Sequence, residues 1–256
     1  MRFRLIGPFQ VTTDDGDVLK ATPPKISQIM ALLLIRANEH VEQDALIREL
    51  WNERPPRSAL NTLQTYVHHA RRLLAPGLRT PDVPTLVTRP GGYVMLVDDD
   101  EVDTHVFQRL VTDAAADLRS RRCESALEAL TSALALWRGP VMSNIPTGAI
   151  LAGHVVRLQE LRIRALEMRV ETMNGLGLSR ETIPELRSLV HDYPLNEWFH
   201  GQLISALHRA GRRSEALHAY QRLRRTLHDE LGMEPSAEAR RAQQSVLGPS
   251  AAETAC

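Results

Sequence analysis

The segment from Ser58 to Leu74 limits the possible folds of this 256-residue chain more than any other. Its apolar residues advance in alternating steps of three and four, which is the spacing of a helix with one buried stripe. The residues of this predicted stripe are Leu60, Leu63, Val67, Ala70 and Leu74. A helix of this kind must pack against a partner and leave its other face to solvent.

The opposite face of this helix is polar and basic. It is expected to carry Asn61, Thr62, Gln64, Thr65, His68, His69, Arg71 and Arg72. The chain has a formal net charge of +0, yet no acidic residue lies between Arg54 and Pro81, where five arginines occur (Arg54, Arg57, Arg71, Arg72 and Arg79). An ordinary exposed face mixes acids with bases, whereas these side chains suit base edges and phosphates. The pattern favours a helix that enters a DNA groove; a merely solvated face is the alternative.

Composition excludes several other classes of protein. Hydrophobic residues at 43% and charged residues at 24% are typical of a folded soluble chain. No apolar run could span a bilayer and the N-terminus turns polar too early for a signal peptide, so we expect a cytoplasmic protein without membrane contact. Binding to DNA would make it nucleoid-associated. Cys123 and Cys256 suggest neither a disulfide nor a metal site. No phosphate-binding loop is present, so we expect neither an enzyme nor a cofactor.

The first hundred residues predict strands, three helices and a hairpin. Strand formers fill residues 2–11, a short strand follows near 17–19, and helices are expected over residues 26–38, 43–51 and 58–74. Ser58 is placed to cap the third helix, which Pro76 and Gly77 close. Residues 86–89 and 93–97 predict a hairpin. This order is typical of a winged helix-turn-helix.

The second part of the chain predicts helices only. It follows an acidic run, Asp98 to Asp103, which we interpret as a solvated connector and domain boundary. Helices are expected around residues 107–118, 126–137, 155–172, 195–209, 213–229 and 236–246, the later ones with the small-and-large pattern of a tetratricopeptide-type pair. The prediction is an α+β winged helix over residues 1–97, a connector over 98–103, an all-α tetratricopeptide-like domain over 104–247 and a disordered tail over 248–256.

Four separated motifs resemble one known family. They are RLIGPF at residues 4–9, ALNTLQTYV at 59–67, RPGGY at 89–93, and AGRRSEALHAY at 210–220 leading to ELGMEPS at 230–236. In this order they are similar to the small members of the Streptomyces antibiotic regulatory protein family, which join an OmpR-like winged helix to a bacterial transcriptional activation domain. The resemblance covers roughly residues 1–247.

The resemblance implies an activator of antibiotic or secondary-metabolite genes. It would bind direct repeats in double-stranded DNA near the promoter −35 element as a head-to-tail dimer and recruit RNA polymerase holoenzyme through its sigma factor. Thr65 and His69 would contact bases, Thr62, His68 and Arg71 phosphates, and Arg89 the minor groove. The loop Trp51, Asn52, Glu53 and Arg54, extending to Arg57, would face polymerase. Some relatives have arginine where this chain has His68 and His69.

Combining both lines of reasoning, we expect anchoring of DNA by Arg54, Arg57, Arg71, Arg72 and Arg89. Base reading is assigned to Gln64, Thr65, His68 and His69, with Thr65 ranked first because the helical face also favours it. The alternative is a helical-repeat adaptor whose basic N-terminal domain binds protein rather than DNA. A gel shift with random duplex at low salt separates the two readings.

Overall fold

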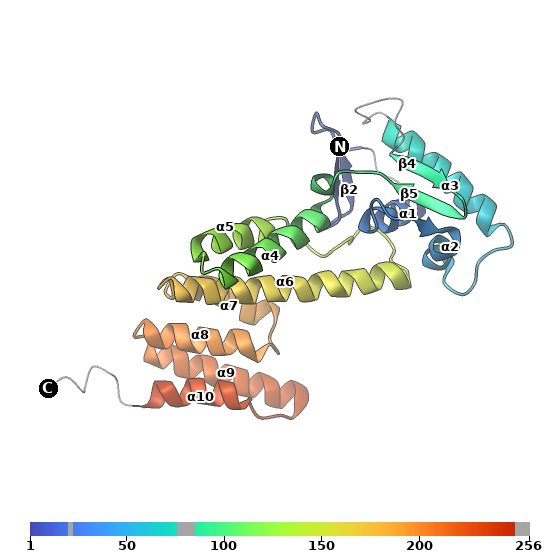
Figure 1. The fold of residues 1–256 in the computed structure, drawn as a ribbon. Helices are drawn as coiled ribbons and strands as arrows, with labels where there is room; N and C mark the ends of the chain where they lie inside the picture. The colour runs from blue at the N-terminus through green and yellow to red at the C-terminus, as the bar shows by residue number, and fades with distance from the viewer. Residues whose placement is uncertain (20–22, 76–84, 249–256) are drawn as a thin grey trace. The chain divides into compact units, whose positions relative to one another are not determined.

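The computed structural model describes residues 1–19, 23–75 and 85–248 (Figure 1). The chain divides into two compact units, Met1–Leu166 and Glu167–Cys256. The predicted helix stop at Pro76 and Gly77, the arginine at position 79, the end of the acid-free window at Pro81 and the tail with Cys256 lie outside the described residues.

A small antiparallel sheet opens the first unit, as predicted. It pairs β1 (Arg2–Arg4) with β2 (Gln10–Thr12) so that Phe3 lies opposite Val11, and both of these side chains are buried. The short strand expected near residues 17–19 is reduced to a single bridge between Val18 and Thr12.

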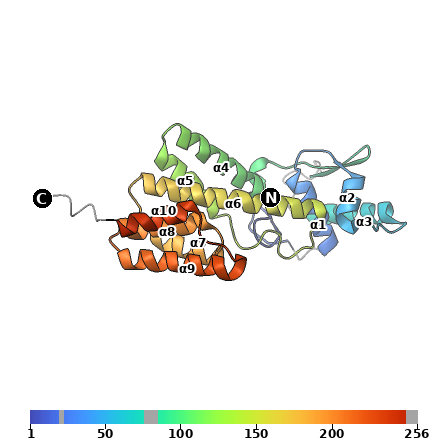
Figure 2. The same cartoon turned by 90° about the horizontal axis from the view of Figure 1, so that it is seen from below.

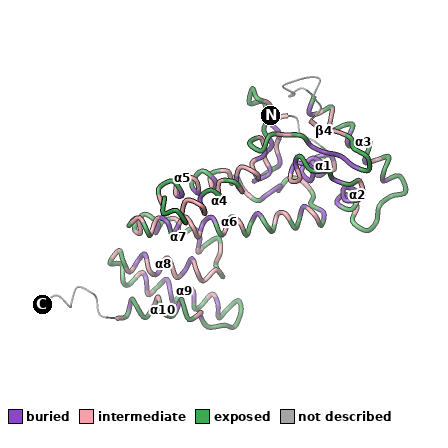
Figure 3. Tube along the Cα trace, viewed as in Figure 1, coloured by how far each residue is buried: buried purple, intermediate pink, exposed green. Residues whose placement is uncertain are grey.

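The winged helix-turn-helix follows. Its elements are α1 (Pro24–Ile35), β3 (Val41–Glu42), α2 (Gln43–Trp51), α3 (Ala59–Leu74), β4 (Leu86–Arg89) and β5 (Gly92–Met95). The strands form a sheet in the order β3-β5-β4, and α1 packs against α2, α3 and β5. Every residue from Ile26 to Leu34 is buried, so α1 is the core of this part (Figure 3).

Strand β3 was not expected from the sequence, because two residues are too few to show an alternating pattern. It brings the segment before α2 against the wing, where Val41 pairs with Tyr93 and Glu42 with Gly92. A Cβ at Gly92 would lie 2.2 Å from the Val41 carbonyl oxygen. Glycine is therefore required for this close approach.

The first unit also contains two helices that pack against each other. After a 3₁₀ turn at Asp99–Glu101, α4 (Asp103–Arg119) and α5 (Cys123–Leu134) lie side by side (Figures 1 and 2). The predicted helix to residue 137 ends at Leu134, and Trp137 instead packs edge-on against Phe107 with ring centroids 5.5 Å apart. The guanidinium of Arg162, on α6 (Ala149–Gly175), lies 4.6 Å from the Trp137 ring. This contact adds a cation–π attraction to the aromatic core.

The acidic run is only partly solvated. Asp98, Asp99 and Asp100 are exposed, but the Asp103 carboxylate accepts hydrogen bonds from the backbone N–H groups of Leu5 (2.7 Å) and Ile6 (3.0 Å). Burial raises the pKa of Asp103, and these two hydrogen bonds oppose that rise. Asp103 therefore fixes the N-terminal segment to the start of α4 rather than serving as a free link.

A second buried carboxylate connects α2 to α6 (Ala149–Gly175). Glu49 is 2% exposed and accepts hydrogen bonds from the backbone N–H groups of Gly148, Ile150 (2.9 Å) and Leu151 (3.2 Å). These are donors at the start of α6 that have no partner within the helix, and their partial positive charge favours an anion. The Gln28 amide donates at 3.1 Å to Glu49 Oε1, the carboxylate oxygen that also accepts from Gly148.

The second unit is helical over its described residues, as expected. Besides the end of α6 it contains α7 (Thr182–Asp192), α8 (Glu197–Arg209), α9 (Arg213–Leu231) and α10 (Ala237–Leu247). Helix α7 packs against α8 and α8 against α9, and α10 returns to contact α8 as well as α9. Gly211 has φ +76° at the turn between α8 and α9, as the sequence indicated. Helix α7 was not expected, because Pro184 looks like a breaker although a helix tolerates proline in its first turn.

Candidate nucleic-acid interface

Helix α3 presents the predicted polar face to solvent. Asn61, Gln64, Thr65, His68, His69 and Arg72 are all exposed, while Thr62 and Arg71 are partly buried at its borders. The face carries no acidic side chain along the whole helix. It therefore offers amide, hydroxyl, imidazole and guanidinium groups without a competing carboxylate.

The buried face of α3 differs from the prediction at one residue. Leu63, Val67, Ala70 and Leu74 are buried as expected, but the first contact is made by Ala59, not by Leu60, which is 43% exposed. Both residues satisfy helical spacing to Leu63, and the small side chain is the one that faces the neighbouring helices.

Ser58 precedes α3 as predicted, but its side chain makes no capping hydrogen bond. Its carbonyl oxygen instead accepts from the Thr62 backbone N–H (2.9 Å) and from Thr62 Oγ1 (3.0 Å). Thr65 Oγ1 donates in the same way to the Asn61 carbonyl oxygen at 3.0 Å. Each threonine hydroxyl thus uses its donor within the helix and keeps acceptor capacity for an outside group.

Arg71 joins α3 to the wing. Its Nε donates to the Leu86 carbonyl oxygen at 2.9 Å and its Nη2 to Thr88 Oγ1 at 2.7 Å. Burial raises the pKa of the Tyr93 phenol on the neighbouring strand, and the charge of Arg71 opposes that rise. Two of the five guanidinium donors are therefore committed to the hairpin, and the others are available to an anion.

The wing places Arg89 at its tip. Arg89 is exposed at the end of β4, pairs across the turn with Gly92, and is followed by Pro90 and Gly91, the latter with φ +74°. The sequence predicted this hairpin and its turn, and the structure confirms both.

The loop between α2 and α3 is exposed along its length. Asn52, Glu53, Arg54 and Arg57 are all open to solvent, and Asn52 has φ +52° where α2 ends. Trp51 is partly buried because its ring stacks on Tyr66 of α3, with centroids 6.4 Å apart and planes 19° apart. This stack ties the start of the loop to the polar helix.

The sequence did not reveal the partners of Arg71 and Trp51. Leu86 and Thr88 lie on a strand that is separated from α3 by a further segment of the chain, and the sequence analysis assigned no contact to Tyr66. Their contacts depend on how α3 packs, which helical spacing does not specify. The other predicted side chains lie on two connected surfaces, the α3 face with the wing and the loop before α3.

The described residues form neither a metal-binding cluster nor a helix that could cross a membrane. Within residues 1–19, 23–75 and 85–248, no group of three or more His, Cys, Asp or Glu side chains is placed to hold a metal ion. Each helix in that described part is too short or too polar to span a lipid bilayer.

Two family models match the chain. Residues 19–95 match the transcriptional regulatory protein C-terminal model, and residues 102–247 match the bacterial transcriptional activator domain. The regulatory protein DnrI of Streptomyces peucetius is 36% identical over 251 residues, which cover 96% of this chain and 92% of that protein. The chain belongs to the Streptomyces antibiotic regulatory protein family.

Other family members are similar over the same length. The transcriptional regulator RedD of Streptomyces coelicolor is 34% identical over 250 residues, covering 96% of this chain and 70% of that protein. A solved structure of Mycobacterium tuberculosis EmbR, in complex with a low-affinity phosphopeptide, matches with a TM-score of 0.86 and 33% identity, covering 96% of this chain and 64% of that one. The family thus consists of transcriptional regulators, and the winged helix and helical fold are those the resemblance implied.

Proposed function

We propose that this protein is a sequence-specific DNA-binding activator of antibiotic or other secondary-metabolite genes. It binds direct repeats near the −35 element as a head-to-tail dimer and recruits RNA polymerase holoenzyme through the sigma factor. Binding to promoter DNA places it with the nucleoid in the cytoplasm. Residues 1–97 are the DNA-binding part, 98–103 the connector, which Asp103 anchors to Leu5 and Ile6, and 104–247 the activation part.

The observation that carries this proposal is the acid-free polar face of α3 beside the wing. A helix fits the width of the major groove, and the exposed side chains of α3 can contact base edges there. These side chains are Thr65, His68, His69 and Arg72. We assign base reading to Gln64, Thr65, His68 and His69. Phosphate anchoring falls to Arg54, Arg57, Arg72 and the remaining donors of Arg71, assisted by the exposed Asn61 and by Thr62 at the border of the face, with Arg89 reaching the minor groove.

Replacing Thr65 tests the placement of the helix. Thr65→Ala removes an exposed hydroxyl that donates only within α3, so we expect stability to hold while the preferred sequence in a selection from random duplexes changes. The matched control is Thr112→Ala, because Thr112 on α4 makes the same backward hydrogen bond, to Gln108 at 2.8 Å. An unchanged motif in the Thr65 variant would contradict the proposed reading of bases.

The exposed loop Trp51–Arg54 is proposed to face polymerase. Glu53→Lys reverses a charge in this loop without touching the stack of Trp51 on Tyr66. We expect transcription in a purified system to fall several-fold while affinity for promoter DNA falls by less than about twofold. Glu128→Lys, an exposed reversal on α5, is the control. Equal loss of DNA binding and transcription would place the loop on DNA instead.

A truncation after Val102 is a poor test of the two-part division. It removes Asp103, which holds Leu5 and Ile6, and it removes residues 148–151, which cover the buried Glu49 carboxylate. Full-length variants avoid this problem.

A gel shift with random duplex at low salt tests the adaptor alternative, because the proposed activator binds such DNA through its arginines and an adaptor does not.

A further inference from the structure

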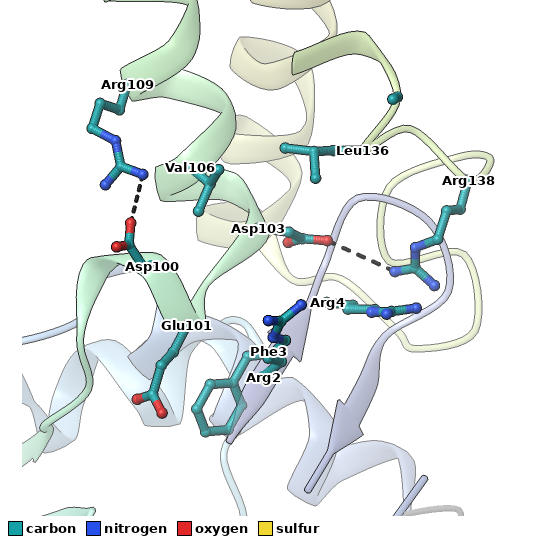
Figure 4. A pocket seen from close by; sticks show the side chains of 11 residues that line it. Arg2, Phe3, Arg4, Asp100, Glu101, Asp103, Val106, Arg109, Leu136 and Arg138 are labelled. Atoms are coloured by element: carbon teal, nitrogen blue, oxygen red, sulfur yellow. Dashed lines mark ion pairs between the residues drawn. The ribbon is translucent and has the colours of Figure 1, made fainter. Parts of the chain in front are cut away.

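A cavity of about 540 Å³ lies in the first compact unit (Figure 4). Its walls come from β1, the acidic segment, the first turns of α4 and the segment after α5. A volume of this size falls in the range of roughly 300–1,000 Å³ typical of small-molecule sites. The cavity is separate from the α3 face and from the loop before it.

Four arginines line this cavity, and they come from separate elements. Arg2 and Arg4 lie on β1, Arg109 on α4 and Arg138 after α5 (Figure 4). Arg2 and Arg4 are two positions apart on a strand, so their side chains project from the same side of it. Neither side chain has a hydrogen-bonding or ionic partner among the residues that the structure describes.

The carboxylates of the cavity already have partners. Asp100 pairs with Arg109 at 2.5 Å, Glu101 Oε2 accepts from the Asp98 backbone N–H at 3.2 Å, and Asp103 accepts from two backbone N–H groups. Arg138 approaches Asp103 only to 3.7 Å, and its Nη1 donates a long hydrogen bond of 3.5 Å to Gln10 Oε1. The carboxylates are thus engaged, whereas the guanidiniums of Arg2 and Arg4 have no partner among the described residues and that of Arg138 has only long contacts. The cavity therefore favours the binding of an added anion.

One part of the wall is apolar. Val106, Ala135 and Leu136 line the same cavity as the arginines. Bare phosphate would leave this surface uncovered, whereas a molecule with both an anionic group and an apolar body would contact both parts.

We propose that this cavity binds a small organic anion, with a carboxylate or phosphate group held by Arg2, Arg4 and Arg138 and an apolar body against Val106 and Leu136. Guanidinium groups bind both oxyanions through paired hydrogen bonds. The ligand touches β1 and the segment after α5 together. The site is independent of the proposed contacts with DNA and polymerase.

The test uses the full chain and simple probes. Isothermal titration calorimetry with 1-naphthyl phosphate is compared with inorganic phosphate and with uncharged 1-naphthol, all in phosphate-free buffer. We expect naphthyl phosphate to bind at least about tenfold more tightly than either part alone. The carboxylate counterpart, 1-naphthoate, identifies the preferred headgroup. Absence of naphthyl phosphate and naphthoate binding at millimolar concentration, or equal binding of inorganic phosphate, overturns the proposal.

Variants locate the binding. Arg4→Gln should weaken the better-bound probe about tenfold or more, since a charge-assisted contact is lost, and Arg2→Gln provides a second test if the first variant is unstable. Arg164→Gln, an exposed arginine on α6, is the matched control and should bind as the unmodified protein does. Unchanged binding in both cavity variants overturns the site. So does displacement of the probe by duplex DNA, which would assign the arginines to the DNA-binding surface.

Discussion

Arg71 has a structural task as well as the proposed contact with DNA. Its hydrogen bonds to the Leu86 carbonyl and the Thr88 hydroxyl hold the wing against α3. The helix and the hairpin would approach DNA as one surface only while these bonds persist. An arginine fits this role because its fork of donors reaches several acceptors at once.

Replacing Arg71 should therefore weaken binding to all DNA sequences alike. We expect Arg71→Ala to lower affinity for both selected and random duplex by about tenfold. Arg71→Lys keeps the charge but not both wing hydrogen bonds, and should recover only part of the loss. Fluorescence anisotropy on both duplexes measures this, with Arg119→Ala on α4 as the control. A change in sequence preference without a general loss would contradict this role.

Single residues also show where sequence reasoning reaches its limit. The exposed face of α3 was predicted from helical spacing, but spacing alone did not distinguish Leu60 from Ala59 at the first buried position. The two lie next to each other on the helix, and the packing against α1 and α2 decides between them. The partners of Arg71 were unpredictable for the same reason, since they belong to a strand whose register is set by the whole sheet.

Among the elements, most were evident from the sequence and two were not. Helix α2 was predicted at its observed bounds, Gln43–Trp51, because its apolar spacing and the following prolines agree. Strand β3 was missed because it is two residues long and exists only by pairing with β5. Helix α7 was missed because Pro184 suggested a helix break, whereas this proline lies in the first turn of the helix, where it is tolerated.

The link between α2 and α6 predicts a large effect of one substitution. Glu49→Ala leaves three backbone donors at the start of α6 without a partner, and we expect it to lower the free energy of unfolding by about 3 kcal/mol. Glu49→Gln, which keeps one acceptor oxygen, should lower the free energy of unfolding by less. Urea unfolding followed by circular dichroism measures both, with exposed Glu128→Ala as the control. A loss below about 1 kcal/mol in the alanine variant would show that this contact contributes little.

For the whole molecule, two histidines predict weaker folding in acid. Burial lowers the pKa of His200 below its ordinary 6.5, aided by Arg222 and opposed by the hydrogen bond with Pro194, and burial with Arg36 and Arg157 lowers that of His154. The unfolded chain therefore binds more protons than the folded one below about pH 6.5. The free energy of unfolding should fall as the pH decreases from that value.

Urea unfolding at about pH 7.5 and 5.5 checks this pH dependence. The decrease should be smaller in His200→Asn, whose replaced side chain does not titrate, than in His218→Gln, which alters an exposed histidine on α9. Identical decreases in the two variants would show that His200 does not contribute to the acid sensitivity.

The contact of Glu49 with residues 148–151 has a consequence for building hybrid regulators. A crossover placed at the acidic run would take Glu49 from one parent and its backbone partners from the other. Gly148 leaves no room for a side chain, since a Cβ there would lie 2.2 Å from the Glu49 carbonyl oxygen. Chimeras between relatives should therefore inherit positions 49 and 148 from the same parent, so the practical unit of exchange is longer than the DNA-binding part.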